Sequence, residues 1–349
     1  MHNVLPGGRR RFLVVGCGSI GKRHIQNLLA LDAGDILAFD IRADRRDDAV
    51  REFGIERVKS LEAAWRADPD VVFITVPTAL HIEIALEAAF RRCHLFIEKP
   101  LSNSWTGVER LLRVVRQNGL VTLIGCNMRF HPGLSRVKQL ISDGAVGDLI
   151  AARVEVGHYL PDWHPWEDYR KSYSARRELG GGVILDAIHE IDYIRWLIGE
   201  VKGAACVAGK LSHLEIDTED TAAILVQFEN GAVGEIHLDY IQRVYSRTCQ
   251  IIGEDGTIHW DYTAGEVRWY SARIRQWNVY SNPRGWEPNQ MYLDEIKHFL
   301  RCLTAEKTPA LDVAGAARVL EIALAAKKSA RQKRWINLRS KTWSPNNIS

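Results

Sequence analysis

The octapeptide Val14-Val15-Gly16-Cys17-Gly18-Ser19-Ile20-Gly21 carries the strongest structural signal in this chain. Its Gly-x-Gly-x-x-Gly pattern follows a β-type apolar run directly, and a helical pattern, Ile20–Leu31, begins inside it. Glycines at these spacings allow a tight turn and a close approach of the backbone to a pyrophosphate, whose charge is stabilised at the helix N-terminus. Because strand, loop and helix follow in this order, we expect the loop, with Ser19 and Ile20, to bind a dinucleotide.

Asp40 is the residue expected to contact the ribose of that dinucleotide. It follows the predicted strand Ile36–Phe39 and lies nineteen residues after the last glycine of the loop. A carboxylate at this place accepts hydrogen bonds from an adenosine ribose and repels a 2′-phosphate, which favours NAD over NADP. Arg42, followed by Arg45 and Arg46, is near enough in the sequence to bind that phosphate, so NADP stays possible.

The first third of the chain alternates β-type runs with helical patterns. The predicted strands are Phe12–Val15, Ile36–Phe39, Val71–Thr75, His94–Ile97 and Val121–Ile124, and the helical patterns between them include Ile20–Leu31, His81–Phe90 and Val108–Arg116. Such alternation is typical of right-handed βαβ units in a largely parallel sheet. We therefore expect an α/β Rossmann domain over residues 1–127.

After about Ile150 the pattern changes to strands joined by hairpin signals. Asn230-Gly231 separates Ala222–Glu229 from Ala232–Tyr240, and Asp255-Gly256 separates Thr248–Gly253 from Thr257–Tyr262. Such a meander predicts an antiparallel sheet. One strong helical pattern, Val183–Ile198, interrupts it, and two more, Tyr292–Leu303 and Val313–Lys328, close the chain. Residues 128–349 are therefore expected to form an α+β domain.

A polar loop, Thr75-Val76-Pro77-Thr78, follows one of the predicted strands, and His81 comes shortly after it. In a doubly wound sheet the carboxyl ends of the strands border the ligand crevice, so we expect these residues to line the cofactor. His81 could instead be an ordinary residue at the start of a helix.

Glu98-Lys99-Pro100 ends the next predicted strand along the chain. A lysine at the crevice, partly desolvated beside a cationic nicotinamide, would have a lowered pKa and could exchange protons with a substrate. The alternative is a surface charge, although Pro100 ends the strand and determines where that lysine emerges.

Three glycines, Gly180-Gly181-Gly182, precede the apolar helical pattern that contains Asp186 and His189. These two residues are three apart and would share about one turn of a helix. A carboxylate beside an imidazole can orient it and stabilise its protonated form. A buried structural His–Asp pair remains the alternative.

The segment Tyr159–Arg170 precedes this helix and is rich in aromatic and hydrogen-bonding side chains. Such side chains suit a polyol, because aromatic faces cover C–H surfaces while polar tips bind hydroxyls. Trp163, His164 and Tyr169 are therefore expected to bind substrate, and Arg177 could bind an anionic substituent. The alternative is a packed loop whose tryptophans belong to the core.

Composition excludes several other classes. Hydrophobic residues make up 46 % of 349, and 46 Lys+Arg against 43 Asp+Glu leave a net charge of only +3, which disfavours a nucleic-acid-binding protein. No apolar run approaches the roughly 18 residues of a membrane helix, so no membrane partner is expected. The 6 cysteines are isolated, which predicts free thiols in the cytoplasm and no metal site. Arg9–Leu13 is similar to a twin-arginine export signal, but cleavage after it would damage the glycine loop, so we expect a basic lead-in to the first strand.

Taken together, these motifs resemble the Gfo/Idh/MocA family of oxidoreductases (glucose–fructose oxidoreductase, inositol dehydrogenase and rhizopine catabolism). The resemblance runs over nearly the whole chain and is carried by Gly16–Gly21, Glu98-Lys99-Pro100, Gly125-Cys126-Asn127-Met128-Arg129-Phe130, the glycine run before Asp186 and His189, and Arg195-Trp196-Leu197. The Glu-Lys-Pro motif at this position is its most specific element.

This resemblance implies a two-domain NAD(P)-dependent oxidoreductase acting on sugars, sugar derivatives or cyclitols. The second domain would have an open, mostly antiparallel sheet that forms a homodimer or homotetramer, with the closing helices packing back on the first domain. In family terms Lys99, Asp186 and His189 are catalytic. Glu98 and Asn127 would lie at the cofactor, and Arg129 at the substrate.

The spacing between Asp186 and His189 departs from the pattern of the family. The family usually has Asp-x-x-x-His, whereas here Asp186 and His189 are one residue closer. At 100° per helical residue, this shortening rotates Asp186 relative to His189 and puts the role of Asp186 in question.

The expected activity is hydride transfer between NAD and a secondary alcohol of a sugar-like substrate, with Lys99 and His189 sharing the hydroxyl proton. One alternative is an NADP-dependent sugar reductase that works mainly toward the alcohol. Another is a non-catalytic dinucleotide sensor, which the presence of Lys99 and His189 disfavours.

Overall fold

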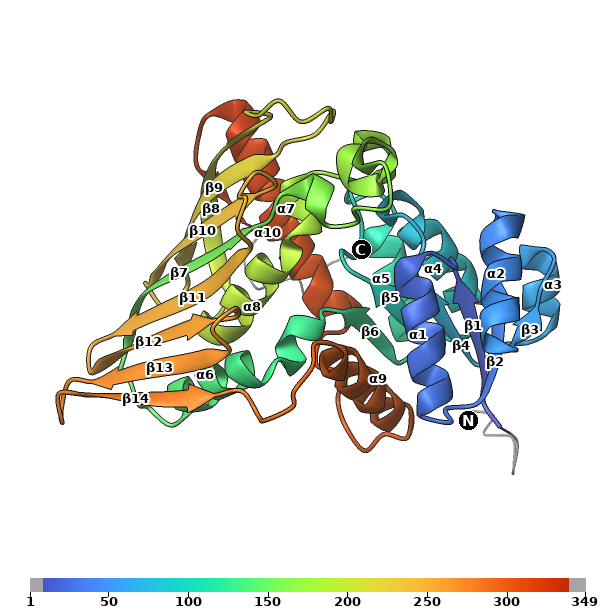
Figure 1. Ribbon diagram of the computed structural model, residues 1–349, viewed down its shortest axis with the longest axis horizontal. Helices are drawn as coiled ribbons and strands as arrows, with labels where there is room; N and C mark the ends of the chain where they lie inside the picture. Colours follow the sequence, from blue (N-terminus) through green and yellow to red (C-terminus); the bar gives the residue numbers. More distant parts are fainter. Residues whose placement is uncertain (1–8, 339–349) are drawn as a thin grey trace. The chain divides into compact units, whose positions relative to one another are not determined.

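The computed structural model describes residues 9–338, which divide into two compact units (Figure 1). Within the described residues, unit 1 consists of 9–127 and Pro288–Ala316, and unit 2 consists of Met128–Glu287 and 317–338. Unit 1 therefore contains a segment from near the end of the chain.

Unit 1 is built on a parallel sheet with the strand order β3-β2-β1-β4-β5-β6. Its strands are β1 (Arg11–Val15), β2 (Asp35–Phe39), β3 (Glu56–Arg57), β4 (Val71–Ile74), β5 (His94–Glu98) and β6 (Thr122–Gly125). The chain order reverses between β1 and β4, and ligands of such sheets bind at the carboxyl ends of the strands beside this reversal. The expected Rossmann sheet is confirmed, with the short strand β3 added at its edge.

Helices connect the strands of this sheet or pack on it. They are α1 (Ser19–Ala30), α2 (Ala43–Phe53), α3 (Leu61–Arg66), α4 (His81–Phe90), α5 (Val108–Asn118) and the later α9 (Asn289–Leu303), with a 3₁₀ turn η1 (Thr78–Leu80) before α4. Local periodicity predicts α1, α4, α5 and α9. It does not predict α2, which buries only Ala49 fully and is otherwise almost entirely charged or half-exposed.

The core of unit 1 is aromatic. The rings of Phe73 in β4 and Phe96 in β5 stack with centroids 4.5 Å apart. Phe299 of α9 meets both rings edge-on, at 5.9 and 5.7 Å. The fully buried Phe299 thus anchors α9 in the core of unit 1, far in sequence from the strands that it covers.

Unit 2 contains a nine-stranded sheet with the order β14-β13-β12-β11-β7-β10-β9-β8-β15 among its described residues. Its strands are β7 (Leu149–Gly157), β8 (Val201–Gly209), β9 (Thr221–Phe228), β10 (Val233–Asp239), β11 (Ser246–Gly253), β12 (Gly256–Asp261), β13 (Glu266–Ser271), β14 (Gln276–Ser281) and β15 (Ile336–Asn337). The two predicted hairpins are present as β9–β10 and β11–β12. The sheet is mixed, because β7 and β10 pair in parallel, and otherwise antiparallel.

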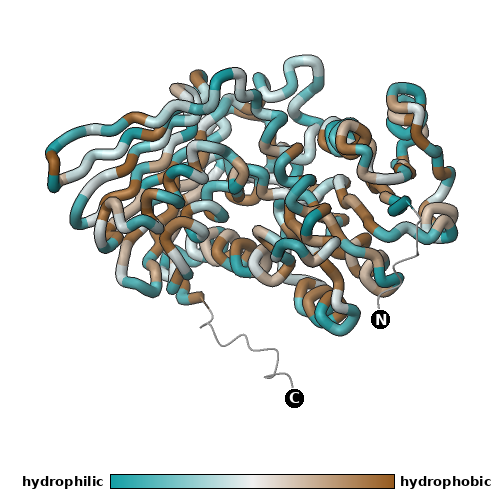
Figure 2. The backbone as a smooth tube through the Cα atoms, turned by 90° about the horizontal axis from the view of Figure 1, so that it is seen from below, coloured by the Kyte–Doolittle hydropathy of each residue, from teal (hydrophilic) through white to brown (hydrophobic). Residues whose placement is uncertain are grey.

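Helices cover one face of this sheet. They are α6 (Pro132–Ser142), α7 (Val183–Asp186), α8 (Ile188–Ile198) and α10 (Val313–Gln332), whose first turn belongs to unit 1. Along β9 the side chains alternate between buried and exposed, as expected for a strand with one covered face. Figure 2 colours the backbone by hydropathy and shows that hydrophilic and hydrophobic residues are interspersed along the described chain.

The predicted helix over Val183–Ile198 is interrupted. Ala187, with φ −88° and ψ 36°, ends α7 and precedes α8. Asp186 and His189 therefore lie on two successive helices, and the angle expected from one continuous helix does not apply to them.

Candidate active site

The glycine loop between β1 and α1 has an open backbone surface. A Cβ atom at Gly21 would lie 1.9 Å from the carbonyl oxygen of Gly16, so α1 can begin this close to the loop only with glycine. At Gly18, the N-cap of α1, the nearest atom to such a Cβ would be Arg45 Nη1 at 3.6 Å. The loop therefore fits a pyrophosphate, which Gly18 would meet at the positive end of the helix.

Asp40 is held against this loop. Its carboxylate is 8 % exposed and accepts hydrogen bonds from the backbone N–H of Cys17 at 2.7 Å and of Arg42 at 2.8 Å. Burial, with the nearby charge of Asp40, raises the pKa of Cys17 to about 12, so that thiol stays neutral. The two remaining lone pairs of the carboxylate suit the hydroxyls of a ribose.

The guanidinium groups of the arginines near Asp40 have different neighbours. The guanidinium of Arg42 bonds the carboxylate of Asp44, with Nε 3.1 Å from Oδ1. Arg45 is instead the cation whose guanidinium lies near Gly18. Of the candidate phosphate ligands, Arg45 is thus nearer to the glycine loop than the predicted Arg42.

The loop after β4 supports the glycine loop from the next strand. Thr75 is buried, and its hydroxyl donates to the carbonyl oxygen of Gly16 at 2.6 Å. Thr78 is also buried, at the start of η1, whereas Val76 and Pro77 are partly exposed. The loop therefore follows β4 beside β1, at the carboxyl edge of the sheet. This is the position expected of a cofactor loop.

Glu98, at the end of β5, stabilises the turn that carries Lys99. Its Oε1 lies 2.7 Å from Nε2 of the fully buried His24, and its Oε2 accepts the backbone N–H of Lys99 at 3.2 Å. Burial and the charge of Glu98 raise the pKa of the neighbouring Tyr292. Glu98, predicted as a cofactor ligand, therefore holds the polypeptide around the half-buried Lys99.

His24 is a residue that the motifs did not single out. It lies three residues after Gly21 on the face of α1 that also buries Ile25 and Leu28. The sequence signal that could have indicated His24 is a histidine at an apolar-face position of this helix. His81 is buried as well, and its ring contacts two backbone carbonyls. Asn127 is buried at the end of the N-terminal part of unit 1.

In unit 2, Asp186 is the centre of a buried hydroxyl cluster. Its carboxylate accepts hydrogen bonds from Ser174 Oγ at 2.6 Å, from Tyr240 Oη at 3.1 Å and from Tyr173 Oη. Burial and the charge of Asp186 hold the pKa of Tyr240 well above its usual range. His189 is also buried, in the first turn of α8.

Arg129 forms a buried, two-bonded ion pair with Asp192. Its Nε and Nη2 lie 2.8 and 2.7 Å from the two carboxylate oxygens, and the guanidinium stands over the ring of Trp196 at 5.5 Å. The pair joins the segment after Asn127 to α8. Asp192, three residues after His189, was not among the predicted site residues.

The predicted substrate loop divides into a packed part and an exposed part. Trp163 stacks on His158 at 5.6 Å, donates its indole N–H to the carbonyl of His158, and meets Tyr240 edge-on at 5.3 Å. It therefore lies beside the hydroxyl cluster of Asp186. His164 is exposed.

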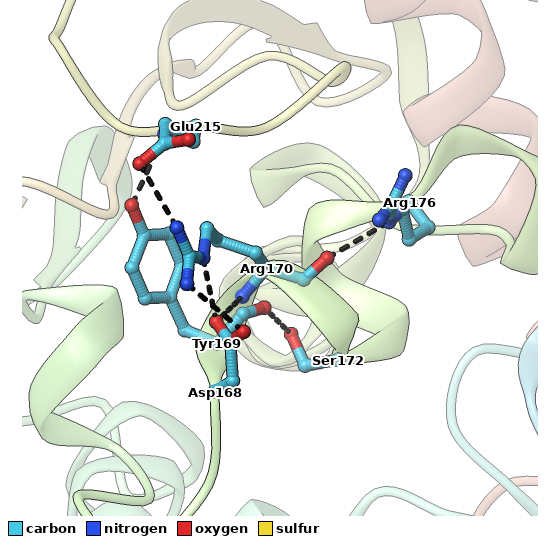
Figure 3. A network of polar contacts seen from close by, with 6 residues as sticks. All are labelled: Asp168, Tyr169, Arg170, Ser172, Arg176 and Glu215. Carbon is cyan, nitrogen blue, oxygen red and sulfur yellow. Dashed lines mark hydrogen bonds and ion pairs between the residues drawn. The ribbon is translucent and has the colours of Figure 1, made fainter.

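Tyr169 takes part in a polar network with Asp168, Arg170 and Glu215 (Figure 3). Arg170 lies between Asp168 and Glu215, and the hydroxyl of Tyr169 accepts the backbone N–H of Glu215 at 3.1 Å. Arg177 donates to the carbonyl oxygen of Asp217 at 2.7 Å. Both predicted ligands thus join the loop to the segment before β9.

Residues 9–338 lack two further features. No helix there is long and apolar enough to cross a membrane. The same residues contain no cluster of three or more His, Cys, Asp or Glu side chains that could hold a metal ion.

A glycine loop at the N-terminus of α1, a fixed carboxylate after β2 and a lysine after β5 define a nicotinamide-dependent oxidoreductase. Residues 10–126 match the oxidoreductase family with an NAD-binding Rossmann fold, and residues 134–259 match the GFO/IDH/MocA C-terminal domain. The chain belongs to the Gfo/Idh/MocA family. The resemblance seen in the motifs is confirmed, as are the expected dehydrogenase class, NAD as the cofactor and the two-part fold.

Known relatives agree with this assignment. The chain is 33 % identical to the uncharacterized oxidoreductase YrbE of Bacillus subtilis over 64 % of this chain and 65 % of that protein. It is 26 % identical to the myo-inositol 2-dehydrogenase of Thermotoga maritima, over 94 % of this chain and 98 % of that enzyme. A levoglucosan dehydrogenase solved with NADH and levoglucosan has the same fold, with a TM-score of 0.85 at 22 % identity, over 94 % and 99 % of the two chains.

Proposed function

We propose that this protein transfers a hydride between NAD and a secondary alcohol of a sugar, sugar derivative or cyclitol. The observation that carries the proposal is the carboxyl edge of the unit 1 sheet, where the glycine loop, Asp40 and Lys99 follow β1, β2 and β5. The similarity to a myo-inositol 2-dehydrogenase over almost the full length supports the substrate class.

Lys99 and His189 are assigned the proton of the substrate hydroxyl. Oxidation of a secondary alcohol to a ketone removes that proton and a hydride from the same carbon, and NAD, when bound, takes up the hydride. Amine and imidazole side chains are among the groups that serve as general acids and bases in catalysis. The proposal therefore gives both residues a proton-transfer role.

The cofactor preference is assigned to Asp40. Its fixed carboxylate supports NAD, because a 2′-phosphate would bring negative charge beside it. The competing proposal is a reductase that prefers NADP, which the guanidinium of Arg45 near Gly18 supports.

Substrate contacts are assigned to Trp163 and His164, with Arg129, Tyr169 and Arg177 in supporting positions. Trp163 presents an aromatic ring beside the Asp186 hydroxyl cluster. The other three are held by Asp192, Glu215 and Asp217, which suits residues that shape a pocket.

The decisive experiment is a dehydrogenase screen over a polyol and amino-sugar panel with NAD and NADP, read from the absorbance of the reduced cofactor. On the substrate found, Lys99→Ala and His189→Ala should each lower kcat by about 10²- to 10⁴-fold with NAD binding preserved. If they form one proton-sharing unit, the double variant should be little worse than the more damaged single variant.

Lys59→Ala, which changes an exposed lysine of unit 1, is the matched control and should have normal kcat. Near-normal turnover by His189→Ala would remove that residue from the mechanism. NAD binding without turnover of any compound in the panel would instead support a dinucleotide sensor.

The uncovered face of the unit 2 sheet is assigned to a second copy of this chain, in a homodimer or homotetramer. Val207, Leu225 and Trp335 are 78, 55 and 41 % exposed there and border a groove of about 1190 Å³. An exposed apolar area of this kind is typical of association surfaces.

Light scattering of the unmodified protein should give the mass of a dimer or tetramer. Leu225→Asp should lower that mass, because it buries a charge at the interface. Val244→Asp, at another exposed apolar residue of unit 2, should leave it unchanged. A monomeric unmodified protein would contradict the assignment.

A cytoplasmic location completes the proposal. All six cysteines are free and buried, which fits a reducing compartment. Cell fractionation with an activity assay tests it, and activity confined to an exported fraction would overturn it.

A further inference from the structure

We propose that His81 is a positioning residue that joins the loop after β4 to the segment carrying Lys99. His81 would thereby fix the position of the loop after β4 relative to the position of Lys99. The part that concerns catalysis rests on the proposed function, whereas the part that concerns NAD binding does not depend on any substrate.

The ring of His81 lies between two backbone carbonyl groups. His81 is the first residue of α4 and is 1 % exposed. Its Nδ1 is 2.8 Å from the carbonyl oxygen of Pro100, and its Nε2 is 2.9 Å from that of Val76. One side chain thus bridges the polypeptide after β4 and the polypeptide after β5.

Each end of this bridge leads directly to a proposed site. Val76 follows Thr75, whose hydroxyl donates to Gly16 in the glycine loop. Pro100 follows Lys99 in the chain. A continuous path therefore runs from the glycine loop through Thr75 and His81 to Lys99, within unit 1.

A second buried histidine holds the same segment from the other side of Lys99. Nε2 of His24 lies 2.7 Å from Oε1 of Glu98, the residue before Lys99. The backbone of Lys99 is therefore held before it by His24 and after it by His81. Only the His81 contact also reaches the loop after β4.

The two contacts of His81 can be separated chemically. Carbonyl oxygens only accept hydrogen bonds, so each contact needs a hydrogen on the ring nitrogen that makes it, and a neutral imidazole carries one. Burial lowers the pKa of His81 more than the two carbonyls and Glu98 raise it, and the charge of Lys99 lowers it further. The ring is therefore neutral at neutral pH and donates to one carbonyl at a time, so its two tautomers alternate between the oxygens of Pro100 and Val76.

Asparagine and glutamine mimic the two ring nitrogens one at a time. In His81→Asn the amide nitrogen can take the place of Nδ1 and keep the bond to Pro100. In His81→Gln it can take the place of Nε2 and keep the bond to Val76. Each variant therefore keeps the contact that one tautomer makes and loses the contact that the other tautomer makes.

The experiment measures three quantities for each variant: the NAD dissociation constant by calorimetry, the rate of Lys99 labelling by reductive methylation, and kcat. His81→Asn should weaken NAD binding about fivefold, the equivalent of one hydrogen bond, with labelling and kcat near normal. His81→Gln should leave NAD binding within about twofold, change the labelling rate, and lower kcat by about 10- to 100-fold, the range for a misplaced group.

His94→Asn is the matched control. His94 begins β5, at the opposite end of the strand from Lys99, and accepts the backbone N–H of Val121. It should leave all three quantities unchanged. Identical losses in His81→Asn and His81→Gln would overturn the proposal, because they would reveal a packing role only, and so would the absence of any change.

A measurement on the unmodified protein covers the case in which the variants do not fold. The ring ¹⁵N resonances of His81 should shift when NAD saturates the protein, since the loop at one end of the bridge contacts the cofactor. Unchanged resonances would overturn the proposal. Failure to find a substrate would count against the proposed function alone, because NAD binding and Lys99 labelling need none.

Discussion

Single residues at the site were predicted by type, but their partners were not. Asp40 was expected to face a ribose, and the structure adds that two backbone N–H groups already fix its carboxylate. Asp186 was expected beside His189, and the structure places its carboxylate among three hydroxyls. The chemistry of each residue follows from its partners as much as from its identity.

Asp40→Ala should narrow the difference between NAD and NADP. Loss of a charged hydrogen-bond acceptor should weaken NAD binding by about 10- to 100-fold, while NADP should lose less because the repulsion of its phosphate also disappears. Calorimetric titration with both cofactors measures the change. Tighter binding of NADP than NAD by the unmodified protein would contradict the role of Asp40 and favour Arg45 as a phosphate ligand.

Asp186→Asn should affect stability more than catalysis. The break at Ala187 places Asp186 and His189 on two successive helices, and an amide has fewer acceptor sites than a carboxylate for the three hydroxyls. We expect a loss of about 1–3 kcal/mol in the unfolding free energy of unit 2, and a smaller fall in kcat than in His189→Ala.

Tyr240→Phe and Ser174→Ala remove single donors from the same cluster and serve as comparisons for Asp186→Asn. They should show the same kind of stability loss in urea unfolding. A fall in kcat for Asp186→Asn equal to that of His189→Ala, at unchanged stability, would show that Asp186 acts directly on the imidazole or the substrate.

Secondary-structure elements follow local pattern wherever one face is clearly apolar. Strands β1, β2, β4, β5 and β6 lie within one or two residues of their predicted bounds, and both Gly-containing hairpins are present. The predictions lack α2, which buries too little to show a hydrophobic face, and they also lack α3 and α6. The predicted helix over Val183–Ile198 is broken at Ala187. Neither the parallel pairing of β7 with β10 nor the place of α9 has a local signal.

Phe299→Ala tests the contribution of α9 to unit 1. Truncation of a fully buried phenylalanine should cost about 3–5 kcal/mol in the unfolding free energy of this unit. Phe90→Ala, at a half-exposed phenylalanine of α4, is the control and should cost much less. Urea unfolding with and without NAD identifies the unit 1 transition, and equal effects of the two substitutions would contradict the packing account.

At the scale of the whole molecule, buried neutral histidines should make the protein sensitive to acid. Burial lowers the pKa of His81, His131, His158 and His298. The shift is large at His131, whose Nδ1 accepts the backbone N–H of Gly133 at the start of α6. Each of these rings binds its proton less readily in the folded protein than in the unfolded chain.

The lowered pKa of His131 makes the protein less stable at low pH. The unfolded chain takes up this proton near pH 6.5, but the folded protein does so only near pH 4. The stabilisation is therefore complete above pH 6.5 and is lost as the pH falls toward 4, by about 3 kcal/mol in total. Urea unfolding followed by tryptophan fluorescence, from pH 4.5 to 8, should show this loss.

His131→Asn should flatten that dependence, because an asparagine oxygen can cap α6 but does not titrate. A variant with the same pH dependence as the unmodified protein would mean that other groups cause the acid sensitivity.

Local sequence was sufficient for the glycine loop, the alternating strands and helices, the hairpins and the position of Lys99. These features depend on residues within a few positions of one another, through backbone freedom, hydrophobic period and turn chemistry. The tertiary structure alone joined Arg129 to Asp192, 63 positions away, and Tyr240 to Asp186, 54 positions away. It alone placed the ring of His81 between the segments after two strands, and only the family resemblance, not local spacing, had indicated that a closing helix packs on unit 1. Such contacts form only when the chain packs, because nothing in the spacing of neighbouring residues specifies which distant groups will meet.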